Sequence, residues 1–181
     1  NTAVGFKTLS SAQDTDAGSN TAMGYTTGFL LSTGNDNCYF GRDAGYHNST
    51  GDNNSFFGKS AGQGEADAAF SGNTGVGKQA LAALTDGASN TAIGLQAGTN
   101  VAGGDSNTCI GALAGDTITT GGYNVYLGYN ADASANSVGN EIVINAGSGA
   151  LVGGGTETIR IGDSTDYIVN DFGENATWNH S

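Results

Sequence analysis

The chain has 181 residues, with 32 glycines, no proline and a net charge of −12 from 17 acidic and 5 basic residues. Collagen is excluded, because the chain has neither proline nor glycine at every third position. Nucleic-acid binding is excluded too, because it requires clustered lysine and arginine. No apolar run reaches the roughly 18 residues of a membrane-spanning helix, so no membrane insertion is expected.

From its first residue the chain repeats one motif, clearest at Asn90-Thr-Ala-Ile-Gly94 and Asn107-Thr-Cys-Ile-Gly111. Glycines mark the copies at spacings of 17 or 19 residues: Gly5, Gly24, Gly41, Gly58, Gly77, Gly94, Gly111 and Gly128. An asparagine lies four residues before each glycine: Asn1, Asn20, Asn37, Asn54, Asn73, Asn90, Asn107 and Asn124. An apolar residue directly precedes each glycine: Val4, Met23, Phe40, Phe57, Val76, Ile93, Ile110 and Leu127. Such regular internal similarity indicates a repeat protein.

Each repeat predicts one coil of a parallel β-solenoid. Its first half is a short strand of apolar and β-branched residues, and its second half is a polar turn rich in Gly, Asn and Asp. The fold class is therefore all-β, with eight coils of 17–19 residues over residues 1–139. Stacking then forms an asparagine ladder and one apolar ridge, and we expect Ile110→Asp to unfold the array by burying a carboxylate. The 19-residue spacings indicate insertions at Asp14–Ser19 and Glu65–Gly72.

The pattern changes after Gly128. Residues 140–162 contain two alternating segments around a glycine-dense stretch, which predicts two capping strands that end the array. Ile142, Ile144, Ile159 and Ile161 are expected on one side of these strands. Residues 163–181 form an acidic polar tail, expected to lead to a downstream region. The helix-like run Gln79–Leu84 is too short to stand alone, so we assign it to its coil.

The motif Asn90-Thr-Ala-Ile-Gly94, followed by Ala97-Gly98, resembles the head repeats of trimeric autotransporter adhesins and the repeats of phage tail fibres. The segment from Asn140-Glu-Ile-Val-Ile to Thr158-Ile-Arg-Ile-Gly162 is similar to one that precedes a self-cleaving chaperone domain in some tail fibres, which favours the tail fibre. The resemblance implies a homotrimeric β-roll in an extracellular attachment fibre. The low content of large apolar residues also predicts that three chains share a core.

No catalytic or cofactor-binding arrangement is visible, so we expect a protein that is not an enzyme. His47 lies in a turn and His180 lies in the tail. No serine or cysteine that could act as a nucleophile accompanies them, beyond those that the repeat pattern already explains. The turn aspartates recur at similar places and offer oxygen ligands for Ca²⁺, a weak alternative to plain surface charge. These residues are Asp16, Asp36, Asp52, Asp86 and Asp105. Cys38 and Cys109 point to opposite faces and are four repeats apart, so they cannot form a disulfide with each other.

The sequence therefore favours a structural and attachment segment of a phage tail fibre, with other fibre or virion proteins and a host surface glycan as partners. Binding is expected in the irregular turns, where a solenoid varies without disturbing its neighbours. The candidate recognition residues are Asp14, Asp16, Tyr46, His47, Glu65 and Asp67. The alternatives are a bacterial trimeric surface adhesin, a glycan-degrading fibre and, from the column of threonines before the apolar residues, an ice-binding solenoid.

Overall fold

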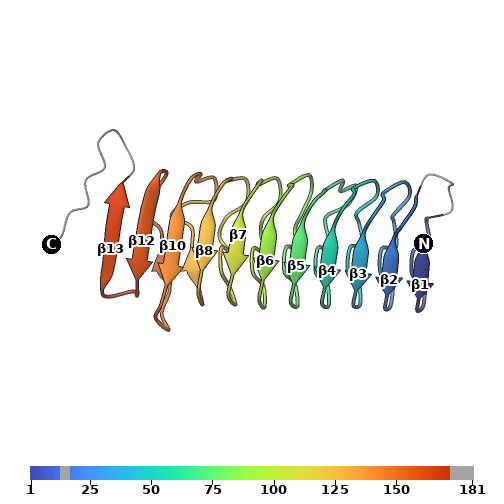
Figure 1. Cartoon of the computed structure of the whole chain (residues 1–181), viewed down its shortest axis with the longest axis horizontal. Coiled ribbons are helices and arrows are strands. Elements are labelled where there is room, and N and C mark those ends of the chain that lie inside the picture. The colour runs from blue at the N-terminus through green and yellow to red at the C-terminus, as the bar shows by residue number, and fades with distance from the viewer. Residues whose placement is uncertain (13–16, 172–181) are drawn as a thin grey trace.

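The computed structural model describes residues 1–12 and 17–171 and shows a parallel β-solenoid, without a helix in these ranges. Eleven strands form one sheet that runs the length of the molecule (Figure 1). In sheet order they are β1 (Thr2–Val4), β2 (Thr21–Met23), β3 (Cys38–Phe40), β4 (Ser55–Phe57), β5 (Thr74–Val76), β6 (Thr91–Ile93), β7 (Thr108–Ile110), β8 (Val125–Leu127), β10 (Ile142–Asn145), β12 (Thr158–Gly162) and β13 (Tyr167–Asp171). A second sheet pairs β9 (Ala131–Asp132) with β11 (Leu151–Val152).

The strand register follows the sequence repeat. Ile93 of β6 pairs with Ile110 of β7, and Ile110 pairs with Leu127 of β8. Each apolar residue before a glycine therefore stacks on its counterpart in the next coil, which confirms the predicted solenoid and its alignment. The run Gln79–Leu84 is a turn within its coil, and Leu81 and Leu84 are fully buried.

The repeated glycine is required by a close approach of neighbouring coils. Gly94 has a φ of +143°, and a Cβ atom added to it would lie 2.4 Å from the carbonyl oxygen of Gly111. The equivalent glycines from Gly5 to Gly128 also have positive φ and face the backbone of the next coil. Any side chain at this corner would collide with main-chain atoms, which cannot move aside as a flexible side chain can.

The core is thin and lies between the strands and the returning half of each coil. The middle residue of each strand points inward, so Tyr39, Phe56 and Tyr126 are buried. Small alanines and aliphatic residues from the returning halves fill the remaining space: Leu31, Ala44, Ala61, Ala80, Leu81, Leu84, Ala97, Val101, Ala114, Ile118 and Ala131. A glycine is required where the core is most crowded, because a Cβ atom at Gly75 would lie 2.9 Å from Phe56.

A ladder of buried asparagines follows one corner of the solenoid. Oδ1 of Asn90 accepts hydrogen bonds from the backbone nitrogen of Asn107 at 2.9 Å and from Nδ2 of Asn107 at 3.0 Å. Nδ2 of Asn90 donates to Asn73 of the preceding coil at 3.1 Å and to the carbonyl of Gly104 at 2.7 Å. The same arrangement recurs from Asn20 to Asn124, so each amide closes its own turn and joins two coils.

The parallel ladder extends past Gly128. β10 pairs in parallel with β8, and β12 pairs in parallel with β10, so residues 140–162 continue the sheet. Within the glycine-dense stretch, β11 pairs with β9 of the preceding coil. Ile142, Ile144, Ile159 and Ile161 share the outward side, as their alternation predicted. β13 joins β12 in antiparallel orientation at the C-terminal edge of the sheet (Figure 1).

Candidate interaction face

The outward side of the 11-stranded sheet, which we name the outer face, carries the most distinctive surface of the chain. The first and third residues of each short strand point outward, and the third is the apolar residue before the glycine. These residues form the apolar column: Val4, Met23, Phe40, Phe57, Val76, Ile93, Ile110 and Leu127. Apart from the half-buried Phe40, they are 36–50% exposed.

The exposure of this column corrects one expectation. A carboxylate at Ile110 would not be buried within a single chain, because the side chain is 36% exposed. The prediction that Ile110→Asp unfolds the solenoid is therefore wrong for an isolated chain. The residues do form one stacked ridge, but the ridge lies on the surface.

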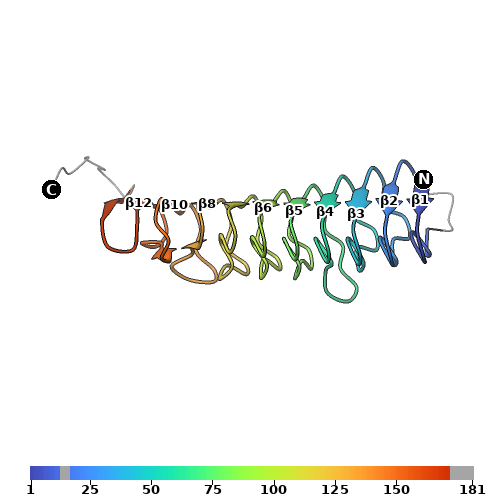
Figure 2. The same ribbon diagram turned by 90° about the horizontal axis from the view of Figure 1, so that it is seen from below.

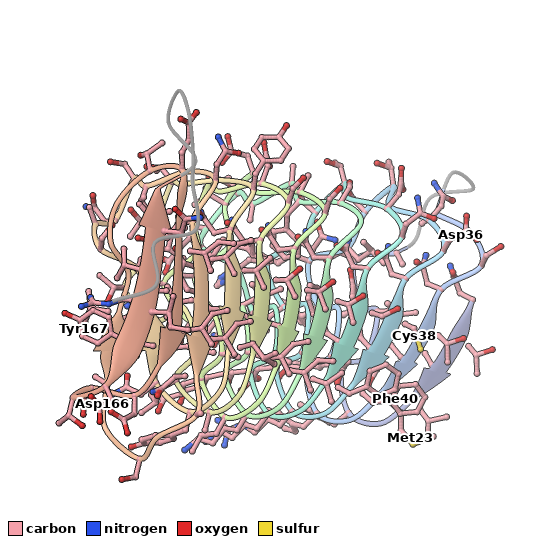
Figure 3. The ribbon with its side chains drawn as sticks, turned by 60° about the vertical axis from the view of Figure 1, so that its left-hand side comes forward. Met23, Asp36, Cys38, Phe40, Asp166 and Tyr167 are labelled. Atoms are coloured by element: carbon pink, nitrogen blue, oxygen red, sulfur yellow. The ribbon has the colours of Figure 1, made fainter. Side chains whose placement is uncertain are left out.

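Aromatic residues divide between the core and the outer face. Tyr39 and Phe56 stack inside the solenoid with ring centroids 5.6 Å apart, whereas Phe40 and Phe57 stack on the outer face at 5.2 Å with rings nearly parallel. Cys38 lies on the same face as Phe40. Asp36 lies at one edge of this face, whereas Phe40 and Met23 lie toward the other edge (Figure 3). Each coil thus presents a polar edge, a narrow half-buried column and an apolar column, in chain order.

The two edges of the outer face differ in charge. The edge that follows the glycines, which we name the C-terminal edge, carries an exposed residue at each coil except that of β7: Phe6, Tyr25, Arg42, Lys59, Lys78, Leu95 and Tyr129. Tyr25 stacks on Phe6 at 5.2 Å, and Tyr25 and Arg42 line an open hollow. The edge that precedes the asparagines, the N-terminal edge, carries Ser19, Asp36, Asn53, Gly72, Ser89, Ser106 and Tyr123.

Two of the three predicted recognition turns, those of Tyr46 with His47 and of Glu65 with Asp67, lie on neighbouring coils. His47 contacts Gly64 through Nδ1 at 2.9 Å, and its backbone nitrogen donates to Gln63 at 2.8 Å. His47 therefore lies beside the turn that begins at Glu65. Tyr46 stacks on Phe29 at 5.1 Å and meets the His47 ring in a T-shaped contact at 4.6 Å. Asp14 and Asp16 lie outside the described residues.

The insertion at Glu65–Gly72 combines an exposed turn with a buried anchor. Glu65, Ala66 and Asp67 are exposed, while Ala68 and Phe70 are buried in the core. Phe70 meets Phe56 edge to face at 5.8 Å, and its carbonyl accepts a hydrogen bond from Asn54 at 2.8 Å. One loop near β4 projects beyond its neighbours in Figure 2, as expected for an extra pair of residues.

Two of the turn aspartates, Asp52 and Asp105, contact the backbone of neighbouring coils. Oδ1 of Asp52 accepts a hydrogen bond from the backbone nitrogen of Asn35 at 2.6 Å, and Oδ1 of Asp105 accepts one from Ala88 at 2.7 Å. These bonds give Asp52 and Asp105 a structural role in joining coils. Within the described ranges, no three His, Cys, Asp or Glu side chains are grouped as ligands for a metal ion.

The cysteine thiols are free, as predicted. Cys109 is buried, and desolvation, followed by the charge of Asp132, raises the pKa of its thiol to about 12. It therefore remains a neutral thiol and acts as a small core side chain. Cys38 is half-buried on the outer face, and burial also raises its pKa.

One buried polar group was missed in the sequence. Glu141 is fully buried and accepts hydrogen bonds from Tyr126 Oη at 3.1 Å, Ser134 N at 3.2 Å and Gly155 N at 2.8 Å. It lies 17 residues after Asn124, and its backbone nitrogen donates to Oδ1 of Asn124 at 2.8 Å. It therefore occupies the next position of the asparagine ladder, a signal that the regular spacing already contained.

No model of a known protein family, no curated protein and no solved structure matches this chain. Among residues 1–12 and 17–171, no helix is long and apolar enough to cross a lipid bilayer.

Proposed function

We propose that this chain is a rigid structural segment of an extracellular attachment fibre, and that three copies assemble in parallel through the outer face. The observation that supports this most strongly is the apolar column, which runs unbroken from Val4 to Leu127 with most members 36–50% exposed. An apolar surface of this length is typical of an interface rather than of a solvated face. A closed cyclic trimer covers it in every copy.

The proposed role is mechanical and involves no catalysis. Coils joined by backbone hydrogen bonds and by the asparagine ladder resist bending along the axis, which suits a segment that extends reach. The resemblance of the repeats to those of phage tail fibres supports our proposal of a virion fibre that contributes to host-cell adhesion. The head of a bacterial surface adhesin requires the same architecture and is the main rival.

The assembly is tested by light scattering of the purified chain and of two variants. We expect the parent to be trimeric at micromolar concentration. Ile110→Asp places a carboxylate in the apolar column and is expected to give a folded monomer, because its side chain is exposed in a single chain. Thr120→Asp changes an exposed turn residue and serves as the control, expected to remain trimeric. A parent that remains an 18.0 kDa monomer would overturn the proposal.

Attachment is tested separately, by measuring whether the purified segment competes with virions or cells for host surfaces. Release of oligosaccharides from host glycan by the purified segment would instead support the glycan-degrading alternative. An ice-binding role draws support from the half-buried threonines beside the apolar column, such as Thr91 beside Ile93. Thermal hysteresis in solution would favour it, whereas the stacked rings of Phe40 and Phe57 interrupt any flat Thr-rich surface.

A further inference from the structure

Aromatic side chains gather on the coils of β1, β2 and β3, beside the C-terminal edge. Phe6 and Tyr25 directly follow repeated glycines and are 58% and 50% exposed. Phe29 and Tyr46 lie four residues beyond that position in their coils and are half-buried. The rings stack in pairs, with centroids 5.2 Å apart for Phe6 and Tyr25 and 5.1 Å apart for Phe29 and Tyr46. We name these residues the aromatic cluster.

The solenoid does not require rings at these positions. In the coils of β4 to β7, the same two positions carry polar or small aliphatic residues: Lys59, Lys78, Leu95 and Ala112 after the glycine, and Gln63, Ala82, Thr99 and Asp116 further along. The backbone pairing is nevertheless the same, because Leu30 N donates to Tyr46 O at 3.0 Å and Ala83 N donates to Thr99 O at 3.1 Å. The fold alone therefore does not explain the cluster, and an exposed apolar patch of this kind marks a binding surface.

Two basic side chains lie against the rings. Nζ of Lys7 is 5.5 Å from the ring centroid of Phe6 and 5.9 Å from that of Phe29, so the two ring pairs belong to one surface. The guanidinium carbon of Arg42 lies 5.9 Å from the ring centroid of Tyr25. Tyr25 and Arg42 line an open hollow of about 360 Å³, a volume in the range of small-ligand sites.

The polar groups beside the rings are held in place and offer both donors and acceptors. Asp43 accepts hydrogen bonds from Nε of Arg42 at 2.9 Å and from the hydroxyl of Thr26. The Arg42 side chain is 61% exposed, so its other N–H groups remain available to donate. Nδ1 of His47 lies 2.9 Å from the carbonyl oxygen of Gly64, which can only accept. Nδ1 therefore carries the hydrogen, and Nε2 of the neutral ring is an acceptor.

These features fit an uncharged ligand rich in hydroxyl groups. A polyanion is disfavoured by the net charge of −12 and by the carboxylate of Asp43 beside Arg42. A peptide strand finds no free sheet edge here, because backbone groups already pair between coils, as where Asp43 N donates to Tyr25 O at 3.0 Å. A sugar ring combines apolar C–H groups with hydroxyls that donate and accept, so it matches both the rings and the polar groups.

We propose that the aromatic cluster, together with Arg42 and His47, is a binding site for a neutral oligosaccharide. Three coils spaced by about 4.8 Å span about 10 Å, which accommodates a short oligosaccharide along the solenoid axis. The inference rests on the proposed attachment role and adds the place of binding and the chemical class of the ligand. Phe29 and Tyr46 lie on the returning half of their coils, so assembly through the outer face does not cover them.

Binding is tested on an array of neutral oligosaccharides of glucose, galactose, mannose, rhamnose and N-acetylglucosamine, with polygalacturonate as the acidic comparison. The tightest neutral binder is then titrated by calorimetry. Tyr25→Ala combined with Tyr46→Thr introduces the residue types that other coils carry at these positions, so we expect the fold to persist. Binding should weaken at least about tenfold, since buried tyrosines dominate binding energy.

Tyr129→Ala is the matched control. Tyr129 also directly follows its glycine and is 48% exposed, but it lies on the distant coil of β8. This variant should bind like the parent. Light scattering and thermal melting accompany every titration, and the exposed single change Tyr25→Ala replaces the double variant if the double variant melts early.

The outcomes separate this site from the proposed function. A trimer that competes for host surfaces but binds no neutral sugar on the array, or binds only polygalacturonate, overturns the site and leaves the attachment role intact. Equal binding by the parent and the folded tyrosine variants also overturns it, because the sugar would then bind elsewhere. A monomer that binds a neutral sugar, with the loss expected for Tyr25→Ala, supports the site and overturns the assembly.

Discussion

Tyr126 donates its phenolic hydrogen to Oε2 of Glu141 at 3.1 Å inside the solenoid. Burial, followed by the nearby charge of Glu141, raises the pKa of Tyr126 well above its usual range, so the phenol remains a donor. Ser134 and Gly155 direct backbone N–H groups at the same carboxylate. A carboxylate only accepts, so Glu141 matches three donors and closes the asparagine ladder at its C-terminal end.

Replacing this carboxylate is expected to destabilise the fold. Glu141→Gln places an NH₂ group against at least one of the three donors, and we expect a loss of ~1–3 kcal/mol in the free energy of unfolding. Tyr126→Phe removes one donor and is expected to cost ~1 kcal/mol. The double variant should cost less than the sum, because Gln then faces one donor fewer. Urea unfolding of the four proteins measures this cycle, and strict additivity would contradict the assigned network.

The asparagine ladder should tolerate neither charge nor loss of an amide. Asn90→Asp removes two donors and turns a carboxylate toward the carbonyl of Gly104 and Oδ1 of Asn73. We expect it to cost more than Asn90→Ala, which leaves buried groups of Asn107 without an acceptor and should cost ~2–3 kcal/mol. Asn100→Ala, at an exposed turn, is the control and should change stability by less than ~0.5 kcal/mol. Equal melting of Asn90→Asp and Asn90→Ala would contradict this account.

Two glycine substitutions separate steric collision from backbone strain. Gly94→Ala adds a Cβ atom 2.4 Å from Gly111 O at a φ of +143°, whereas Gly155→Ala meets nothing within 4 Å at a φ of +116°. Gly155→Ala should therefore cost only the strain of a positive φ, ~1–3 kcal/mol. Gly94→Ala should cost clearly more, measured by thermal melting. Similar losses in both variants would show that coil spacing does not determine the glycine column.

The repeat columns predicted the strands and their register because each column reports one position in space. They did not predict which column faces inward. The inward column varies from Ala92 through Cys109 to Tyr126, because neighbouring core residues compensate for one another in volume. The apolar column contains a large apolar residue in every repeat. Such uniformity is typical of a buried core, but in this chain the column forms a ridge on the surface. Pairs such as Phe56 and Phe57 offer no local signal, because both residues suit either side of a strand.

Glu141 could have been identified from its spacing after Asn124, but nothing local signals that a buried carboxylate replaces an amide there. Its partners Ser134 and Gly155 come from irregular segments whose paths depend on the whole coil. The contact between His47 and Gly64 likewise arises from stacking of two coils, so sequence spacing alone did not join the two recognition turns.

Asp116 predicts a pH dependence of stability. Desolvation, followed by the charge of Asp132 and a hydrogen bond with it, raises the pKa of Asp116 from 3.8 to about 6. The folded chain therefore retains a proton that the unfolded chain releases, so the contribution of Asp116 to stability falls as pH rises from about 4 to 6. Asp116→Asn removes this titration. We expect its melting temperature to exceed that of the parent at pH 7 and to approach it at pH 4. Parallel pH profiles would contradict the pairing.

The exposed turn of the insertion is expected to serve recognition rather than stability. Deleting Ala66 and Asp67 restores the 17-residue spacing and retains the buried Ala68 and Phe70. Because the deleted residues are exposed, the change in melting temperature should be small, provided that Glu65 and Ala68 rejoin in a shorter turn. Adsorption to host cells should fall, because the turn follows Gly64, which contacts His47, and one loop near β4 projects beyond its neighbours (Figure 2).

The control for this deletion is Asp86→Ala, a change in an exposed turn of regular length that should alter neither melting nor adsorption. Light scattering of each variant shows whether the assembly survives, which separates a lost binding loop from a lost fibre. Unchanged melting with reduced adsorption supports a recognition role for the insertion. Unchanged adsorption in the deleted variant contradicts it, because the turn would then be dispensable, and the segment would act only as a spacer between other parts of the fibre.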